Sequence, residues 1–90
     1  MVFQLRYSSS ARNSLKKINR ENALKIMSEL ESLSKENCPE SYFKTLHGFD
    51  NPPLYSLRVG NYRAVMSVFN DVMVIHVIEI GHRSSVYWKF

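Results

Sequence analysis

Two arginines flank a short turn in the second half of the chain and are the residues best suited to carry chemistry. Arg58 and Arg63 lie on either side of Gly60-Asn61, a dipeptide typical of two-residue β-hairpin turns. In such a hairpin Arg58 faces Arg63, with the two β-carbons about 4.5–5.5 Å apart on one face of the sheet. Two guanidinium groups at this distance repel each other unless an anion lies between them. The pair favours a phosphate site, although two long side chains that diverge into solvent would also fit the pattern.

Small polar residues are predicted beside this arginine pair. Ser56 shares a sheet face with Arg58, and Ser67 shares one with Arg63, because side chains an even number of residues apart on a strand point the same way. Neither serine fills much space. The face is therefore predicted to form an open, cationic concavity large enough for a phosphate group.

The C-terminal segment supplies further candidates for contact with a nucleic acid. Arg83 follows the last predicted strand and is able to turn back toward the sheet, and Lys89 adds positive charge. Tyr87 is expected to stack on a nucleobase, a contact worth about 1–3 kcal/mol per base. Trp88 and Phe90 are instead expected to pack against the edge of the core.

The three histidines do not form a metal-binding pattern. His47, His76 and His82 lack ligand spacing with one another and with Cys38, so no metal or other cofactor is expected. His76 lies in an apolar run and is read as a core histidine. His82 stands beside Arg83 at the end of a strand, where an imidazole is a natural general acid or base near neutral pH.

Carboxylates contribute little to the candidate site. Asp50, Asp71 and Glu79 are the only acidic residues after Glu40, and no two of them form an evident pair. The chain also lacks a Ser-His-Asp order and a glycine-rich phosphate loop. These absences disfavour a glycosidase, a triad hydrolase and a P-loop enzyme.

The first half of the chain is predicted to form a strand and a helical hairpin. Residues 2–7 alternate as a strand, and residues 9–17 form a short helix preceded by possible serine caps. Asn19 is the expected N-cap of a second helix that runs to about Lys35. The buried stripe of this helix is predicted to contain Leu24, Met27, Leu30 and Leu33, widened by Ala23 and Ile26.

Residues 36–53 are predicted to form an irregular connector. They contain all three prolines and one of the three glycines. Proline lacks a backbone N–H and glycine lacks a side chain, so both weaken regular strands and helices. Tyr42, Phe43 and Leu46 are expected to attach this connector to the core.

The remaining residues are predicted to form three strands. Residues 54–59 and 62–69 flank the hairpin turn, and the β-branched run 72–80 indicates a central strand buried on both faces. The order β-α-α-β-β-β places the chain in the α+β class, with an N-terminal strand, a helical hairpin and an antiparallel sheet. One sheet face covers the helices, and the other is left free for a ligand.

Length and composition indicate one small basic domain spanning residues 1–90. Twelve Lys and Arg residues against eight Asp and Glu residues give a net charge of +4, which suits a nucleic acid or an acidic partner. Five of the six lysines lie before position 45 and are assigned to helical faces. A lone cysteine and the lack of any apolar run of about 18–20 residues predict a cytoplasmic protein with no membrane segment.

Several short motifs, taken in order, resemble one known group of proteins. They are Leu46-His-Gly48, the run from Leu54 to Arg63, the run from Val77 to Arg83, and Val86-Tyr87. Their order and spacing resemble the RelE/ParE toxin superfamily, and the resemblance covers nearly the whole chain. It implies a RelE-like fold and a messenger RNA-cleaving toxin of a type II toxin-antitoxin system.

The resemblance also implies a reaction and a set of residue roles. RelE-like members cleave messenger RNA in the A site of the small ribosomal subunit, by attack of a ribose 2′-hydroxyl and without a metal. By position, Arg58 matches the basic group assigned to activating the nucleophile, and Arg63 matches the arginine that binds the phosphate. Arg83 matches the arginine assigned to protonating the leaving oxygen, and Tyr87 matches the tyrosine that stacks on a base.

Three features depart from the RelE pattern. Ser56 stands where bacterial RelE has a second lysine, so the basic cluster is thinner. The segment from Arg83 to Tyr87 is shorter, and His82 stands where other members carry a lysine and could take over part of the proton transfer. Arginine itself stays protonated at neutral pH, so its better role is electrostatic stabilisation of the transition state.

The resemblance finally implies partners and leaves alternatives. A RelB-like antitoxin is expected to bind the helical hairpin and the sheet edge, and the toxin-antitoxin complex to bind operator DNA. One alternative is a ParE-like inhibitor of DNA gyrase, a class that generally lacks the combined set of Arg58, Arg63, Arg83 and Tyr87. Another is a catalytically weak member that only binds an antitoxin, which the serine at position 56 leaves open.

Overall fold

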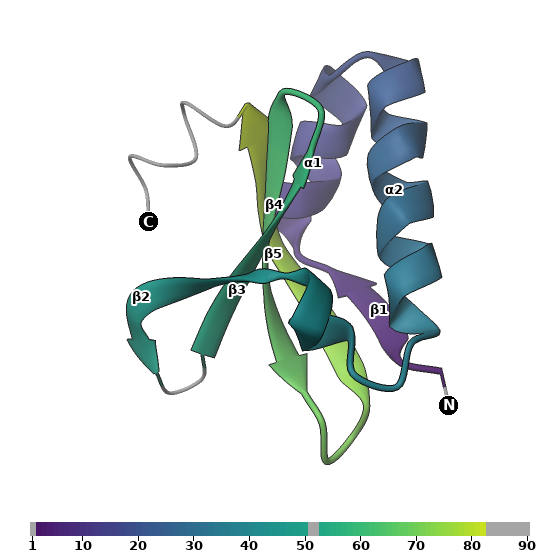
Figure 1. Ribbon diagram of the computed structural model, residues 1–90. Coiled ribbons are helices and arrows are strands. Elements are labelled where there is room, and N and C mark those ends of the chain that lie inside the picture. Colours follow the sequence, from purple (N-terminus) through teal and green to yellow (C-terminus); the bar gives the residue numbers. More distant parts are fainter. Residues whose placement is uncertain (1, 51–52, 83–90) are drawn as a thin grey trace.

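The chain forms a sheet with two helices on one side. The computed structural model describes residues 2–50 and 53–82, with side chains for all of these except 47–50. The elements are β1 (Gln4–Tyr7), α1 (Ser9–Lys17), α2 (Arg20–Ser34), a 3-10 turn η1 (Pro39–Tyr42), β2 (Lys44–Asp50), β3 (Pro53–Val59), β4 (Tyr62–Phe69) and β5 (Val74–His82). In the described part, five strands make one sheet in the order β1-β5-β4-β3-β2 (Figure 1).

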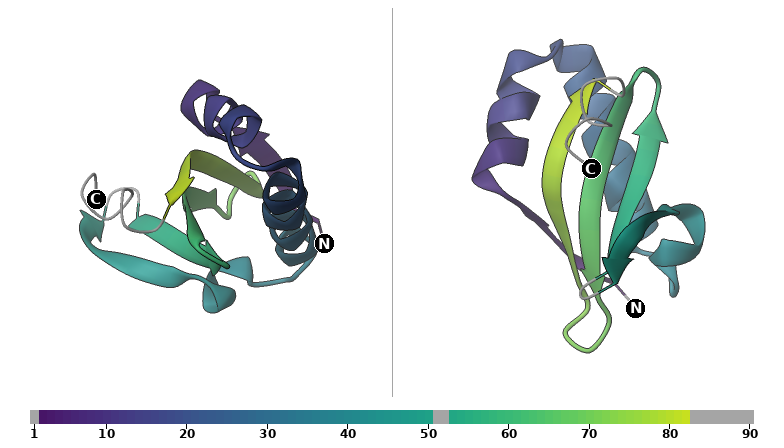
Figure 2. Two further views of the ribbon diagram at one scale, coloured as in Figure 1. Left: turned by 90° about the horizontal axis from the view of Figure 1, so that it is seen from above. Right: turned by 90° about the vertical axis from the view of Figure 1, so that its left-hand side faces the viewer.

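The predicted α+β class and element order are confirmed, with two additions. β1 pairs with β5 in parallel, whereas the other neighbours pair antiparallel, so the sheet is mixed. The second addition is β2. Figure 2 shows both helices on one side of the sheet, with β2 bending away from them at the far edge.

Local capping sets the helix boundaries where the sequence predicts them. The Ser8 side chain accepts a hydrogen bond from the Ala11 N–H at 3.0 Å, and its own hydroxyl donates to the Ile78 carbonyl on β5 at 2.5 Å. The Asn19 side chain accepts from the Glu21 N–H at 2.8 Å. These caps satisfy backbone donors that have no partner inside the helix, and Ser8 also attaches α1 to the sheet.

The buried stripe of α2 is narrower than predicted. Ala23, Ile26 and Leu30 are buried, but Leu24 is 55% exposed and Met27 is 39% exposed. The prediction was wrong for these last two residues. A helix that packs on one sheet face buries only one stripe, and residues three and four apart lie along it.

The prediction of an irregular connector over residues 36–53 was wrong for its second half. Lys44 pairs with Ser56 and Leu46 pairs with Leu54, which makes β2 the edge strand next to β3. The prolines flank this strand and do not interrupt it. Phe43 is buried, as expected, whereas the side chain of Tyr42 is 57% exposed and does not attach the segment to the core.

β5, predicted to be the central strand, is an interior strand next to the edge strand β1, whereas β4 is the middle strand, and β5 is not fully buried on both faces. Ile75 and Val77 are completely buried, whereas Val74 and His76 are half-buried. His76, predicted to be a core histidine, pairs with Arg6 of β1 and retains partial exposure. β1 pairs with residues 74–77 and β4 pairs along the strand, so residues 74–77 have a neighbouring strand on both sides.

A β-bulge in β5 changes which side chains face the core. Val65 pairs with Glu79 and Met66 pairs with Val77, so Ile78 is an extra residue without a partner on β4. Such a residue interrupts the alternation of side chains between the two faces. As a result Val77 and Ile80, three residues apart, both lie in the main core.

The main core lies between the sheet and the helices, and a second, smaller cluster lies on the opposite face. Leu54 and Val65 form this second cluster, with Leu46 and Ile78 packed against them. The face opposite the helices therefore carries a small apolar cluster of its own, and both helices lie on the other side. None of the described helices is long and apolar enough to cross a membrane.

Candidate functional site

The hairpin that positions the two arginines has the predicted register. Val59 pairs with Tyr62, and Arg58 pairs with Arg63 in the next position. Gly60 has a φ of 60°, a backbone conformation that side-chain-bearing residues rarely adopt, and this permits the two-residue turn. A short local signal thus places two cationic side chains opposite each other on one sheet face.

The two arginines have different environments. Arg63 is only 8% exposed, and its Nη1 donates a hydrogen bond to Ser56 Oγ at 3.3 Å. Arg58 is exposed, and its Nε donates to the Gly60 carbonyl at 3.2 Å. One guanidinium group is thus held within the sheet face, and the other lies at its rim. Ser56 is itself 2% exposed, so the partner of Arg63 is a buried hydroxyl.

This site lies on the sheet face that the helices leave uncovered. Ala64, the residue after Arg63, belongs to the main core with the helices, so alternation along β4 turns Arg63 the other way. Gly81 of β5 is the cross-strand neighbour of Arg63 and has no side chain to fill the space beside it. Both arginines therefore lie on this face at the end of the sheet where the β3–β4 turn is.

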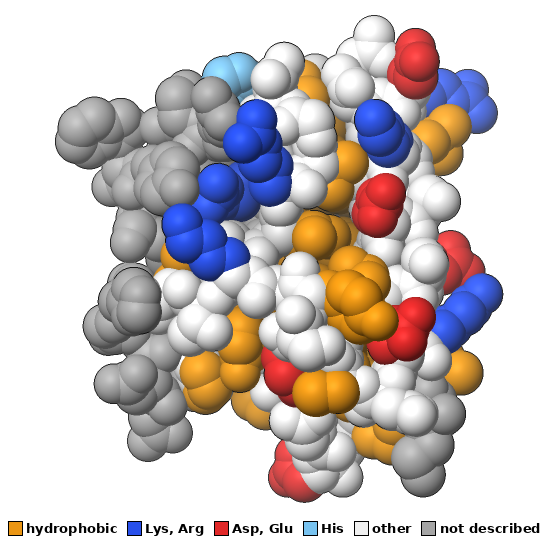
Figure 3. All heavy atoms as spheres, in the orientation of Figure 1, with side chains coloured by type: hydrophobic (Ala, Val, Ile, Leu, Met, Phe, Trp, Pro, Cys, Tyr) orange, Lys and Arg blue, Asp and Glu red, His pale blue; other side chains and the backbone are white. Residues whose placement is uncertain are grey.

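Sequence reasoning missed one basic residue of this surface. Lys44 lies opposite Ser56 in the β2–β3 pair, and it is exposed. From the sequence alone Lys44 was expected on a helical face, because residues 44–50 were not recognised as a strand. Figure 3 shows Lys and Arg side chains gathered over β2, β3 and β4, strands whose described basic residues are Lys44, Arg58 and Arg63.

Glu79 is the acidic residue nearest to the arginines in the sheet register, and its side chain is hydrogen-bonded to helix α1. Glu79 is the cross-strand neighbour of Val65 on β4. Its two carboxylate oxygens accept hydrogen bonds from the Ser10 hydroxyl of α1 at 3.0 and 3.1 Å. The two serines predicted beside the arginines, Ser56 and Ser67, are each 2% exposed and lie on the same face as the arginines.

The structure does not bring His82 together with the arginines. His82 pairs with Tyr62, and the two rings lie 6.1 Å apart in an edge-to-face arrangement. Tyr62 packs against the main core, so this pair lies on the helix side of the sheet, opposite to the side of Arg63. The other predicted site residues, Arg83, Tyr87 and Lys89, lie outside the described residues, as do Trp88 and Phe90.

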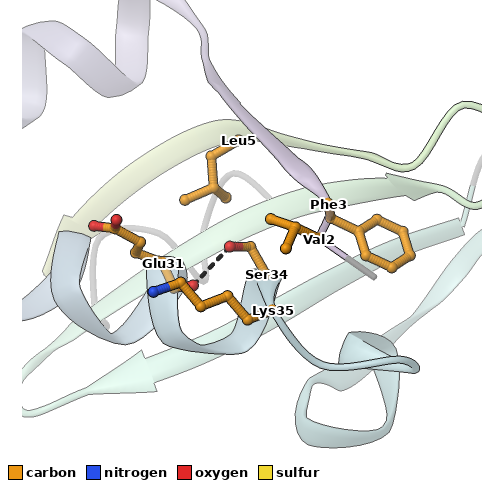
Figure 4. A pocket seen from close by; sticks show the side chains of 6 residues that line it. All are labelled: Val2, Phe3, Leu5, Glu31, Ser34 and Lys35. Atoms are coloured by element: carbon orange, nitrogen blue, oxygen red, sulfur yellow. Dashed lines mark hydrogen bonds between the residues drawn. The ribbon is translucent and has the colours of Figure 1, made fainter.

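Two further features of the described residues bear on the chemistry. No three His, Cys, Asp or Glu side chains among residues 2–50 and 53–82 lie close enough to hold a metal ion. A cavity of about 290 Å³ lies between β1 and the end of α2 (Figure 4), lined by Val2, Phe3, Leu5, Glu31, Ser34 and Lys35. Its lining is mostly apolar, and it is separated from the arginine pair by the strand order, so it is not part of the candidate phosphate site.

Comparison with protein families gives one match over most of the chain. Residues 5–87 match the family described as the ParE toxin of the parDE type II toxin-antitoxin system. No curated protein is similar enough in sequence to match.

Solved toxin structures share the fold. A chain of the RelBE2 toxin-antitoxin complex of Mycobacterium tuberculosis is 21% identical, with a TM-score of 0.79 and coverage of 93% of this chain and 94% of that one. A mutant Escherichia coli RelE toxin in the free state is 23% identical, with a TM-score of 0.77 and coverage of 98% and 93%. A chain of the RelB-RelE complex of Methanococcus jannaschii is 26% identical, with a TM-score of 0.60 and coverage of 94% and 98%.

Proposed function

Because the chain belongs to the ParE toxin family of type II toxin-antitoxin systems, within the RelE/ParE superfamily, we propose that this toxin is a ribosome-dependent endoribonuclease. It cleaves messenger RNA in the ribosomal A site and acts in the cytoplasm, where it inhibits translation. One observation carries the proposal. Arg58 and Arg63 lie opposite each other on the helix-free face of the sheet, with Arg63 held by a hydrogen bond to Ser56.

The reaction is an attack within the RNA chain. The 2′-hydroxyl oxygen forms a bond to the adjacent phosphorus, the bond from phosphorus to the 5′-oxygen breaks, and a 2′,3′-cyclic phosphate and a 5′-hydroxyl result. One proton leaves the 2′-oxygen and one is added to the 5′-oxygen. The phosphorane between these steps carries more negative charge than the phosphodiester, so cations fixed beside it accelerate the reaction.

The two arginines suit different parts of this task. Arg63 is buried and already held in place, so it stabilises the developing charge with little reorganisation. Arg58 is exposed and able to offer paired N–H donors to the phosphate oxygens as the RNA enters. Guanidinium groups stay protonated at neutral pH, so they act by electrostatics and are poor at transferring protons. Arg83 and Tyr87 are proposed to complete the site by contacting the leaving oxygen and a base.

Alignment of the 2′-hydroxyl must supply much of the rate. The 2′-hydroxyl is already attached beside the phosphorus, so what remains is to hold it in line with the leaving oxygen, a geometry that a flexible RNA alone does not keep. In this proposal the ribosome supplies that geometry, so free RNA is a poor substrate.

The test compares naked messenger RNA with the same message on a programmed ribosome. We expect breaks in register with codons on the ribosome and little or no cleavage of the naked message. A double variant, R58A/R63A, prepared in the same way, controls for contaminating nucleases. Equal cleavage of both substrates would contradict the proposal.

We also propose that an antitoxin protein neutralises this toxin. Two of the similar structures are complexes of RelE-type toxins with RelB-type antitoxins. In this chain the exposed side chains of Leu24 and Met27 on α2 offer apolar surface on the helical hairpin. Co-expression with the protein encoded beside it should yield a stable complex that binds operator DNA and lacks toxicity. Toxicity that persists in the purified complex would contradict this role.

A second candidate function follows from the matching family itself, which is described as the ParE toxin. A toxin of that kind would inhibit DNA gyrase and cut no RNA. Expression of the chain in cells, followed by primer extension and a gyrase supercoiling assay, separates the two. Codon-registered RNA breaks support the ribonuclease, whereas gyrase inhibition without RNA breaks supports the second candidate. A lack of both effects would indicate a catalytically weak, antitoxin-binding member.

A further inference from the structure

We propose that Lys44 is a third phosphate-contacting residue of the arginine site and takes the cationic role that Ser56 cannot fill. The inference rests on the proposed ribonuclease function. It assigns to Lys44 a direct contact with a non-bridging oxygen of the RNA phosphodiester that is cleaved.

The register of the edge strand brings Lys44 to the site. Lys44 is the first residue of β2 and lies opposite Ser56 of β3. Directly paired residues in an antiparallel sheet share a face and have β-carbons about 4.5–5.5 Å apart. Ser56 in turn accepts the hydrogen bond from Arg63, and Arg58 is two residues further along the same face. Lys44 thus lies on the same sheet face as both arginines, one strand away from Arg58 and two strands away from Arg63.

The fold gives Lys44 no evident structural task. It is exposed, and within the described part of the chain its side chain makes no hydrogen bond or ion pair. Ser56, its cross-strand neighbour, is buried and already accepts from Arg63. Lys16 and Lys17, in contrast, lie in the last turn of α1, where positive charge stabilises the helix dipole.

A third cation beside two arginines is unfavourable until an anion arrives. Like charges on one sheet face repel each other, and the burial of Arg63 reduces the screening of that repulsion by water. A phosphodiester reverses the sign of these interactions, and the more highly charged phosphorane does so further. Lysine suits this contact because its ammonium group is a mobile point charge with three donors. It stabilises charge here and transfers no proton.

The experiment measures single-turnover cleavage of a message on programmed ribosomes over a range of toxin concentrations. The variants are K44A, K44R and a matched control, K25A, which removes one exposed lysine from α2. We expect the maximal rate of K44A to fall about tenfold, the loss typical of one charged hydrogen bond. K44R should keep most of the rate because it keeps the charge, and K25A should match the unmodified protein.

Each other result has a definite meaning. If K44A cleaves as fast as K25A while the unmodified toxin is active, the role of Lys44 is wrong and the proposed function stands. If K44A changes only the toxin concentration for half-maximal rate, Lys44 contacts a phosphate of ribosomal RNA and its placement in the site is wrong. If the unmodified toxin fails to cleave, the proposed function falls and this inference falls with it. Should K44A not fold, K44Q, which keeps the side-chain length, decides the same question.

Discussion

The two faces of β4 are both buried but are built from different kinds of residue. Toward the helices the strand presents Ala64 and Met66, which are 1% and 0% exposed and pack into the main core. Toward the other side it presents Arg63 and Ser67, which are 8% and 2% exposed, with the apolar Val65 between them. Burial of a charged group costs free energy that apolar residues of similar size would not cost. We therefore expect substitutions on the helix face to lower stability and substitutions of Arg63 to lower the proposed activity.

The strongest way to test this contrast is to weaken the helix face. Leu30 is completely buried, so we expect L30A to lower the free energy of unfolding by about 2–5 kcal/mol, because it leaves a cavity. The matched control is L24A, since Leu24 is 55% exposed on the same helix and should change stability by less than about 0.5 kcal/mol. Urea unfolding monitored by circular dichroism measures both. Equal losses would show that α2 packs by a different stripe.

The next test removes the charge from the arginine face and keeps the volume. We expect R63M to reduce cleavage on programmed ribosomes by about 10²–10³-fold, because the variant loses a fixed donor to the transition state. Its thermal stability should stay equal or rise, since an apolar side chain replaces a buried charge. R12M, a change at an exposed position of α1, is the control for both measurements. A marked loss of stability in R63M would show that the arginine face is structural.

The smallest expected effect concerns Tyr7, which β1 presents to the main core. Burial raises the pKa of the Tyr7 hydroxyl above its ordinary value of 10.0, and the nearby carboxylate of Glu31 raises it further. The folded state therefore holds this proton more tightly than the unfolded state. This difference stabilises the folded state in full below pH 10. The stabilisation is lost as the pH rises through the higher pKa that Tyr7 has in the folded state.

Unfolding measured between pH 8 and pH 12 checks this expectation. Y7F should lose less stability over that range than the unmodified protein, because it has no hydroxyl proton to release. Y42F, a change at an exposed tyrosine, serves as the control and should follow the unmodified protein. If Y7F and Y42F lose the same amount of stability between pH 8 and pH 12, a group other than Tyr7 is responsible for the loss.

Local signals in the sequence were enough to predict the features that local structure determines. Ser8 and Asn19 cap the helices through contacts two or three residues away, so the helix boundaries agree closely with the sequence pattern. The Gly60-Asn61 turn likewise fixes the register of Arg58 against Arg63 without help from distant residues.

The features that the sequence did not reveal depend on distant contacts. β2 exists because its backbone pairs with β3, and this pairing is not visible in a segment flanked by prolines. The exposure of Leu24 depends on how much of α2 the sheet is able to cover. The place of Lys44 in the candidate site was missed for the same reason as β2, since a residue on an unrecognised strand has no predicted neighbours.

The extra residue Ile78 gives β5 two segments whose side chains alternate out of phase. The segment before it places Ile75 and Val77 against the helices, and the segment after it returns Ile80 to that side and Gly81 to the side of Arg63. A regular strand through the same residues, with Ile78 paired and no bulge, would turn Glu79 toward the apolar interior and put Ile80 beside the arginines. The bulge therefore decides which face each of the last residues of β5 occupies, so one irregularity of the backbone serves both the packing of the core and the side of the sheet that carries Arg63.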